Sequence, residues 1–362
     1  GGRGADNPNT IRQPGPDEIL FTPDDTFRGL QGGNGGIAGA GVGGLVRLSA
    51  NGGTITSDGA PVDISVAGLS GDGGDGGVGS GGTGACCSGF VDRGGNVLFE
   101  ATSTSAGAGR ILLGDTTIQA NGFIAGRIEL RSASTISLTS LTADAQGFAA
   151  ATNNDTDRSA YGIFFAANGG AIDVANDLTV RTGGSFGAYA QRGGQVRAGG
   201  LFQIDAADQV DLRHDERGNA ANPTLFAGGD LLVTAGTTIR GTRDSLLAAN
   251  GATALSALGP VGSIAVDRLA GDNITIATTG AASVEHAEAD NDFTGTAGSF
   301  RTGLNSIITG GDITISSPGA VDLGNSSAGG FVFVFGQSIV FANINAAASV
   351  SLFASGTAQG AE

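Results

Sequence analysis

The stretch "GGDITISSPGAVDLGNSSAGGFVFVFGQSIVFANINAA", from Gly310 to Ala347, contains one pattern written twice. Each copy opens with a Gly-Gly pair, continues through two short β-forming runs and ends in a turn of small residues. The second copy begins nineteen residues after the first. A unit of about twenty residues cannot bury its own apolar face, so it must stack on a copy of itself. We therefore predict that one pattern is one turn of a β-solenoid.

A related unit occurs upstream, where "GDNITIATTGAASVEHAEA" (Gly271 to Ala289) aligns with "GGDITISSPGAVDLGNSSA" (Gly310 to Ala328). Apolar residues two apart coincide in this alignment, and side chains two apart in a strand share one face. We expect the coinciding residues to point into the core: Ile274, Ile276, Ala282 and Val284 in the first unit, and Ile313, Ile315, Val321 and Leu323 in the second.

The composition supports an all-β fold. Of 362 residues 67 are Gly, and 40 % of the chain is apolar, which is enough for a continuous core. Gly costs about 1 kcal/mol relative to Ala inside a helix, so this chain disfavours helices. We predict a parallel β-helix over residues 43–362, with Gly-rich loop insertions near 70–89, 148–162 and 213–224. Residues 1–42 are rich in Pro and Gly and are predicted to be a linker or edge segment.

The net charge of −16 disfavours nucleic acid and anionic membranes as partners. No run of 18 apolar residues exists that would cross a bilayer as a helix. Because Met is absent, we expect the chain to be a processed product or part of a longer protein. An acidic chain whose basic residues are all Arg is compatible with an extracellular location.

The two cysteines, Cys86 and Cys87, are adjacent. Three states stay open for them: two free thiols, a strained bridge between neighbours, or cross-links between chains. Their spacing excludes a zinc site.

Acidic residues cluster in "SVEHAEADND". Alternating carboxylates in a loop can supply oxygen ligands to calcium, and the alternative is a solvated acidic turn. The calcium candidates are Glu285, Glu288, Asp290 and Asp292, which flank His286, with Asp72 and Asp75 as a further pair. The charges of "RHDER", residues 213–217, are expected to pair with one another and with water.

Motifs typical of enzymes are weak. "GDGGDG" at residues 71–76 matches a phosphate-binding pattern, but no helix follows it. "GGSFG" around Ser185 matches a nucleophile elbow, yet only His214 and His286 exist as bases. A glycan-cleaving β-helix needs converging carboxylates, and the only Asp-Asp pair, Asp24 and Asp25, lies in the Pro-rich leader. We predict that the chain is not an enzyme, and calcium is the one cofactor that the sequence suggests.

The segment "FVFVFGQSIVF" places aromatic and aliphatic side chains on opposite faces of a strand. If the nineteen-residue register holds, Val332, Val334 and Val340 point inward, whereas a slip of one residue would exchange the inward and outward sets. In the first case the outer face would present Phe331, Phe333, Phe335 and Phe341, which are our interface candidates. Such a face needs a cover, either a loop or the N-terminal segment of this chain, or another chain or following domain.

The units "GGDITISSPGAVDLG", "GDNITIATTGAASV", "GGAIDVANDLTVRT" and "GGDLLVTAGTTIRG" resemble the repeats of filamentous-haemagglutinin-type exoproteins, which leave bacteria by two-partner secretion. The resemblance covers residues 43–362 and is clearest after Gly169. It implies a right-handed β-helix in a surface-exposed or released bacterial fibre, often an adhesive one. Host or matrix glycans are the partners that such adhesion implies.

The C-terminal segment "ASVSLFASGTAQGAE" is typical of strand and turn, with no predicted cap. An uncapped coil favours pairing with further coils or end-to-end stacking into fibres. The leading hypothesis is therefore a structural or adhesive segment of a secreted or cell-surface fibre. The alternatives are a β-helical protein that binds glycans and one that cleaves them.

Overall fold

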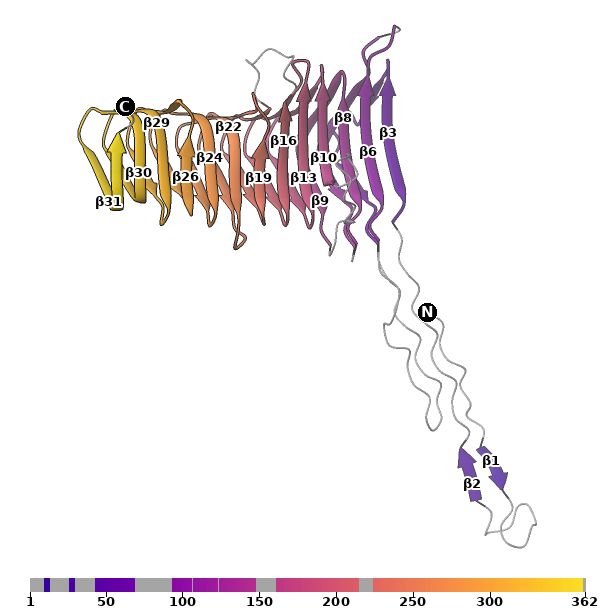
Figure 1. Cartoon of the computed structure of the whole chain (residues 1–362). Coiled ribbons are helices and arrows are strands. Elements are labelled where there is room, and N and C mark those ends of the chain that lie inside the picture. Colours follow the sequence, from indigo (N-terminus) through magenta and orange to yellow (C-terminus); the bar gives the residue numbers. More distant parts are fainter. Residues whose placement is uncertain are drawn as a thin grey trace.

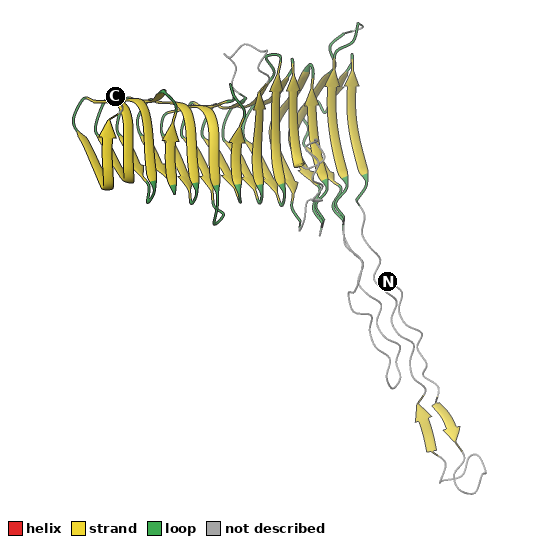
Figure 2. Cartoon of the chain, in the orientation of Figure 1, coloured by secondary structure: helices red, strands yellow, loops and turns green. Residues whose placement is uncertain are grey.

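The computed structural model describes residues 10–13, 26–29, 43–68, 93–105, 107–122, 124–147, 161–214 and 224–360. Its regular elements in these ranges are all β-strands (Figure 2). The described part accordingly has no helix with the length and hydropathy needed to cross a membrane. The prediction of an all-β fold is confirmed.

Parallel strands of successive coils form one 29-stranded sheet. Figure 1 shows these coils side by side in chain order, from β3 (Leu45–Asn51) to β31 (Val350–Gly360). Each inner strand pairs with the coil before it and the coil after it, so its backbone N–H and C=O groups are satisfied on both sides. This is the predicted parallel β-helix.

The pairings follow three faces around each coil. The first face consists of β3, β6 (Asn96–Thr102), β8 (Arg127–Ser132), β10 (Tyr161–Asn168), β13 (Ser185–Gln191), β16 (Gln209–His214), β19 (Thr238–Gly241) and β26 (Ser299–Thr302). The second face consists of β4 (Thr54–Thr56), β11 (Ala171–Val174), β14 (Gln195–Ala198), β17 (Leu225–Ala227), β20 (Leu246–Ala249) and β27 (Asn305–Thr309). The third face consists of β5 (Val62–Ser65), β12 (Leu178–Thr182), β15 (Phe202–Ala206), β18 (Leu231–Ala235), β21 (Thr253–Ala257), β23 (Ile274–Thr278), β25 (Phe293–Thr296) and β28 (Ile313–Ser316).

Longer strands pass around a corner and contribute to more than one face. They are β7 (Arg110–Gln119), β9 (Thr135–Ala145), β22 (Ser263–Gly271), β24 (Ala281–Ala289), β29 (Ala320–Ala328), β30 (Val332–Ala346) and β31. Within residues 1–42, β1 (Thr10–Gln13) and β2 (Thr26–Gly29) pair antiparallel.

Most of the predicted loop insertions lie outside the described residues. At their described ends, Tyr161 and Gly162 belong to β10, and Arg213 and His214 belong to β16. Thr224 is fully buried, and its N–H donates to the Leu246 carbonyl at 2.8 Å. The coil therefore extends up to these described ends of the predicted insertions.

The nineteen-residue repeat is confirmed by the pairing of Ile313 with Val332. The upstream alignment spans two windings, because Phe293 lies between Ile274 and Ile313 in the stack. All eight residues expected to point inward are buried, with exposures of 0 or 1 %, and they belong to one core. Full burial of an Ile or Val contributes about 1.5–3 kcal/mol, so this core stabilises the stack coil by coil.

The corner between the second and third faces explains the recurring Gly-Gly-Asp motif. The Asp of one coil accepts a hydrogen bond from a backbone N–H of the next coil, a group that would otherwise lack a partner at the corner. The Oδ1 acceptors and N–H donors are Asp177 and Leu201 at 2.8 Å, Asp230 and Ala252 at 2.8 Å, Asp292 and Asp312 at 2.8 Å, and Asp312 and Phe331 at 2.7 Å. We call this series the Asp ladder.

The second Gly of the motif makes room for the carboxylate beneath it. A Cβ on Gly330 would lie 2.0 Å from Asp312 Oδ1, and one on Gly311 would lie 2.3 Å from Asp292 Oδ1. In the last coil Ala348 follows Gly330 in the stack, where its neighbour below is Phe331 rather than an Asp. Glycine is therefore needed where an Asp lies one coil below.

This coupling predicts a non-additive pair of substitutions. Gly330→Ala should lower the free energy of unfolding by about 1–3 kcal/mol through overpacking, and Asp312→Ala by about 1 kcal/mol through the lost hydrogen bond. In the double variant the new methyl no longer meets a carboxylate, so the combined cost should be smaller than the sum. Equilibrium urea unfolding measures all three variants, and strictly additive costs would contradict the ladder.

Candidate functional site

The four calcium candidates do not come together. Glu285 and Glu288 lie on β24, and Glu288 Oε1 is 2.8 Å from His286 Nε2. Asp292 is part of the Asp ladder, where Oδ1 accepts the Asp312 N–H. Asp290 lies in the turn between β24 and β25, with its side chain exposed. Across the described ranges, no three His, Cys, Asp or Glu side chains gather in a geometry that would hold a metal ion.

Removal of calcium should therefore leave the stability unchanged. We expect the same midpoint of thermal unfolding in excess chelator and in millimolar calcium, because Asp292 already has a backbone partner. Asp292→Ala is the matched control, and it should lower the midpoint equally in both conditions. A calcium-dependent midpoint in the unsubstituted chain would contradict this account.

Other candidates lie partly or wholly outside the described residues. Asp72, Asp75, Cys86, Cys87, Asp215 and Glu216 all belong to this group. Of the "RHDER" stretch, Arg213 binds Asp211 of its own strand, with Nη2 and Oδ2 2.8 Å apart. Asp211 is 2 % exposed and also pairs with Arg240 of the next coil at 3.2 Å, so it joins two coils. Ser185 donates its hydroxyl to Asp208 Oδ2 at 3.0 Å, with no histidine in that contact.

The Phe-rich segment follows the expected alternation only in its first half. Val332 and Val334 are fully buried, and Phe331 and Phe335 are exposed, as predicted. Val340 was expected to point inward and is 41 % exposed.

Phe341, an interface candidate expected outside, is partly buried and packs against the core. In β30 the buried positions are even-numbered up to Gly336, and the next buried position is Ile339. The alternation changes there because β30 turns from the third face to the first, and its pairing with β31 shifts between Gly336 and Ser338. A corner therefore exchanges the two sets of side chains.

The aromatic cluster on the third face includes a residue that the sequence analysis missed. The rings of Phe335 and Phe353 stack with centroids 4.8 Å apart, and Phe331 and Phe333 lie 5.8 Å apart. Phe353 is 54 % exposed, the largest exposure among these rings. The alternation in "VSLFAS" of β31 was the signal that would have placed it beside Phe335.

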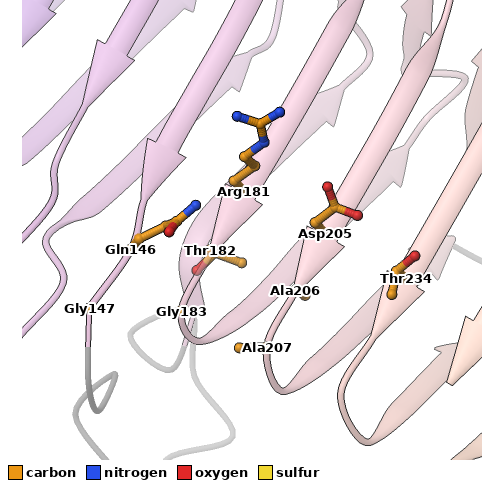
Figure 3. A pocket seen from close by; sticks show the side chains of 9 residues that line it. All are labelled: Gln146, Gly147, Arg181, Thr182, Gly183, Asp205, Ala206, Ala207 and Thr234. Carbon is orange, nitrogen blue, oxygen red and sulfur yellow. The ribbon is translucent and has the colours of Figure 1, made fainter. Parts of the chain in front are cut away.

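A groove lies further along the third face, beside its corner with the first (Figure 3). Its volume is about 730 Å³, and its polar side chains come from four consecutive coils. They are Gln146, Arg181, Asp205 and Thr234, which follow one another across neighbouring strands in Figure 3, together with Thr182 next to Arg181. Glycines and alanines at the corner complete the lining.

Charge and hydrogen-bonding capacity are both present in this groove. Arg181 is exposed, and within the described chain no hydrogen bond or ion pair engages its side chain. Asp205 Oδ2 accepts a hydrogen bond from Gln203 Nε2 at 2.7 Å, and Oδ1 of the same carboxylate is available to a ligand. The groove can therefore offer a guanidinium, a carboxylate, an amide and a hydroxyl to a polar ligand that lies along the coils.

No sequence motif predicts this groove, because the coils that form it differ in length. Arg181 pairs in register with Asp144 of β9 on one side and Asp205 of β15 on the other. These neighbours are separated by unequal lengths of chain, one of which includes an insertion. Only the folded stack brings them side by side.

The outward residues of the third face change character along the rod. Around β9 to β15 they include the charged residues of the groove, and at β30 and β31 they include Phe333, Phe335 and Phe353. Between these zones they are uncharged and, apart from Leu232, small, and Thr234 lies where this zone meets the groove. The third face thus combines three chemically different surfaces on one regular backbone.

Comparisons with protein-family models, curated proteins and solved structures found no match to this chain.

Proposed function

We propose that this chain is a structural and adhesive segment of a secreted or cell-surface bacterial fibre, of the filamentous-haemagglutinin type that its repeats resemble. The Asp ladder is the observation that carries the proposal. Its carboxylates and glycines are committed to joining one coil to the next. A motif that joins coil to coil favours a protein whose function is to form a long rod.

The continuous core supports the same proposal. One cluster of buried residues runs from Ala50 on β3 to Ile339 on β30. Each coil contacts mainly its two neighbours, which is the arrangement that lets solenoids extend as fibres. The exposed phenyl rings of the last coils are the surface we propose for self-association or for contact with neighbouring coils of a longer protein.

The rings of Phe331, Phe333, Phe335 and Phe353 form the aromatic cluster of the third face, which we call the phenyl cluster. This proposal predicts rods that associate through it. Negative-stain electron microscopy should show rods, and sedimentation velocity should show assembly that increases with concentration. Phe335→Asp and Phe353→Asp should each abolish that assembly, because they place a charge within the apolar surface.

Ala265→Asp adds the same charge at an exposed position of the first face and should assemble like the unsubstituted chain. Compact particles instead of rods would argue against a fibre. Equal loss of assembly in all three variants would argue against the phenyl cluster.

A glycan-binding or glycan-cleaving β-helix is the second candidate, and the groove around Arg181 favours it. Asp144 and Asp205 lie two coils apart with Arg181 between them, a backbone separation of about 10 Å. Inverting glycosidases hold their carboxyl groups roughly 6.5–9.5 Å apart. Asp144, however, is engaged on one side by Asn121 Nδ2 at 3.3 Å, and its Oδ1 is buried.

Incubation with acidic and neutral polysaccharides separates the two candidates. A structural rod should release no new reducing ends and no unsaturated products. Turnover that Asp205→Asn abolishes, while Asp173→Asn on the second face retains it, would replace the structural proposal by the enzymatic one. Binding without turnover, lost in Arg181→Gln, would assign the groove to glycan recognition.

A further inference from the structure

The middle of the third face carries a surface without charge. On β18, β21, β23, β25 and β28 the side chains that alternate with the core point outward. We call these ten residues the hydroxyl face: Leu232, Thr234, Ala254, Ser256, Thr275, Ala277, Thr294, Thr296, Thr314 and Ser316. None of them is ionisable, in a chain whose net charge is −16.

The other two faces of the same coils are charged. The outward positions of the first face include Arg240, Arg301 and Asp322. The outward positions of the second face on β22 and β24 include Arg268 and Glu288. The absence of charge is therefore specific to the third face and does not follow from the composition of these coils.

The hydroxyl face is a regular two-dimensional array. One file of outward residues runs Leu232, Ala254, Thr275, Thr294 and Thr314, and the other runs Thr234, Ser256, Ala277, Thr296 and Ser316. The pairings that create both files contain no register shift. Adjacent positions are separated by about 4.8 Å between coils and about 6.6 Å along a strand.

A fully packed core holds this array in place. Behind the two files lie Ile274, Ile276, Phe293, Ile313 and Ile315, each 0 or 1 % exposed. Close-packed cores have little freedom to deform. Apart from Leu232 at one end of the array, the outward side chains are Ala, Ser and Thr, which are short and stay close to the plane of the sheet.

Within the described protein, no side-chain hydrogen bond engages the Thr and Ser residues of the two files. Inward and corner hydroxyls of the same strands are engaged: Thr253 donates to the Ala270 carbonyl at 2.8 Å, and Thr278 donates to the Gly262 carbonyl at 2.6 Å. The hydroxyl face therefore satisfies its donors and acceptors outside the protein.

The chemistry of the array selects a type of ligand. The hydroxyl face contains no aromatic ring, carboxamide, carboxylate or guanidinium, so it lacks the planar groups that stack on a soluble ligand or bind it through paired hydrogen bonds. Charged side chains, which would bind water individually and irregularly, are also missing. Methyl and hydroxyl groups at fixed repeats instead favour water molecules that are arranged on a matching lattice. We propose that the hydroxyl face binds the surface of ice crystals, a role that goes beyond the structural function proposed above.

Ice-affinity partitioning and the shape of single ice crystals test this proposal on the full chain. The unsubstituted protein should be enriched in a slowly growing ice fraction and should facet the crystals. Thr294→Lys and Thr296→Lys, both at exposed strand positions, should reduce the partitioned fraction to that of an inert protein. Ala265→Lys on the exposed first face should leave it unchanged, and circular dichroism should show the same fold in all variants.

Several outcomes would overturn the proposal. One is an unsubstituted chain that does not partition into ice, and another is an equal loss of partitioning in Ala265→Lys. Sedimentation with microcrystalline cellulose provides a second arm, since binding there without ice partitioning would assign the face to a crystalline polysaccharide. These results are independent of whether rods are seen by electron microscopy, so the two proposals fail separately.

Discussion

The in-register parallel pairing of each strand with the coils on both sides is the constraint on which the whole structure depends. Alternation along a strand sends every second side chain into the core, and the register aligns those side chains from coil to coil. The same register aligns the outward side chains. An outward residue therefore has its closest neighbours one winding away. A charged, polar or apolar surface on the rod is built from residues that are one coil apart in the sequence.

Corners are the places where this regularity has to be maintained by particular residues. A strand supplies its own partners through the sheet, whereas a corner leaves backbone N–H groups without them. The Asp ladder fills that need, and the glycine above each Asp leaves the required space. This is why acidic residues and glycines recur together, although in the described ranges they do not assemble into a metal site. Much of what looked like a binding motif is used to hold one coil on the next.

Outward residues of the strands do not hold the coils together, and their chemical character differs along the rod. From β9 onward the third face carries the charged groove around Arg181, then the neutral hydroxyl face, and then the phenyl cluster around Phe335. All three lie on strands with the same pairing and a common core. A rod of this kind separates stability from function, because the inward half of each strand holds the coils while the outward half is available for partners.

The sequence by itself determined the all-β class, the nineteen-residue winding from Ile313 to Val332 and the inward residues of regular strands, because alternation and repetition are local properties of the chain. Tertiary structure decided the rest. The bend of β30 reversed the expected roles of Val340 and Phe341, and Gly295 occupies an inward position where the Phe300 ring fills the space of the missing side chain. The groove and the hydroxyl face likewise combine residues separated by coils of unequal length. Local alternation fixes the direction of a side chain within a strand, but only stacking fixes which side chains from different coils become neighbours.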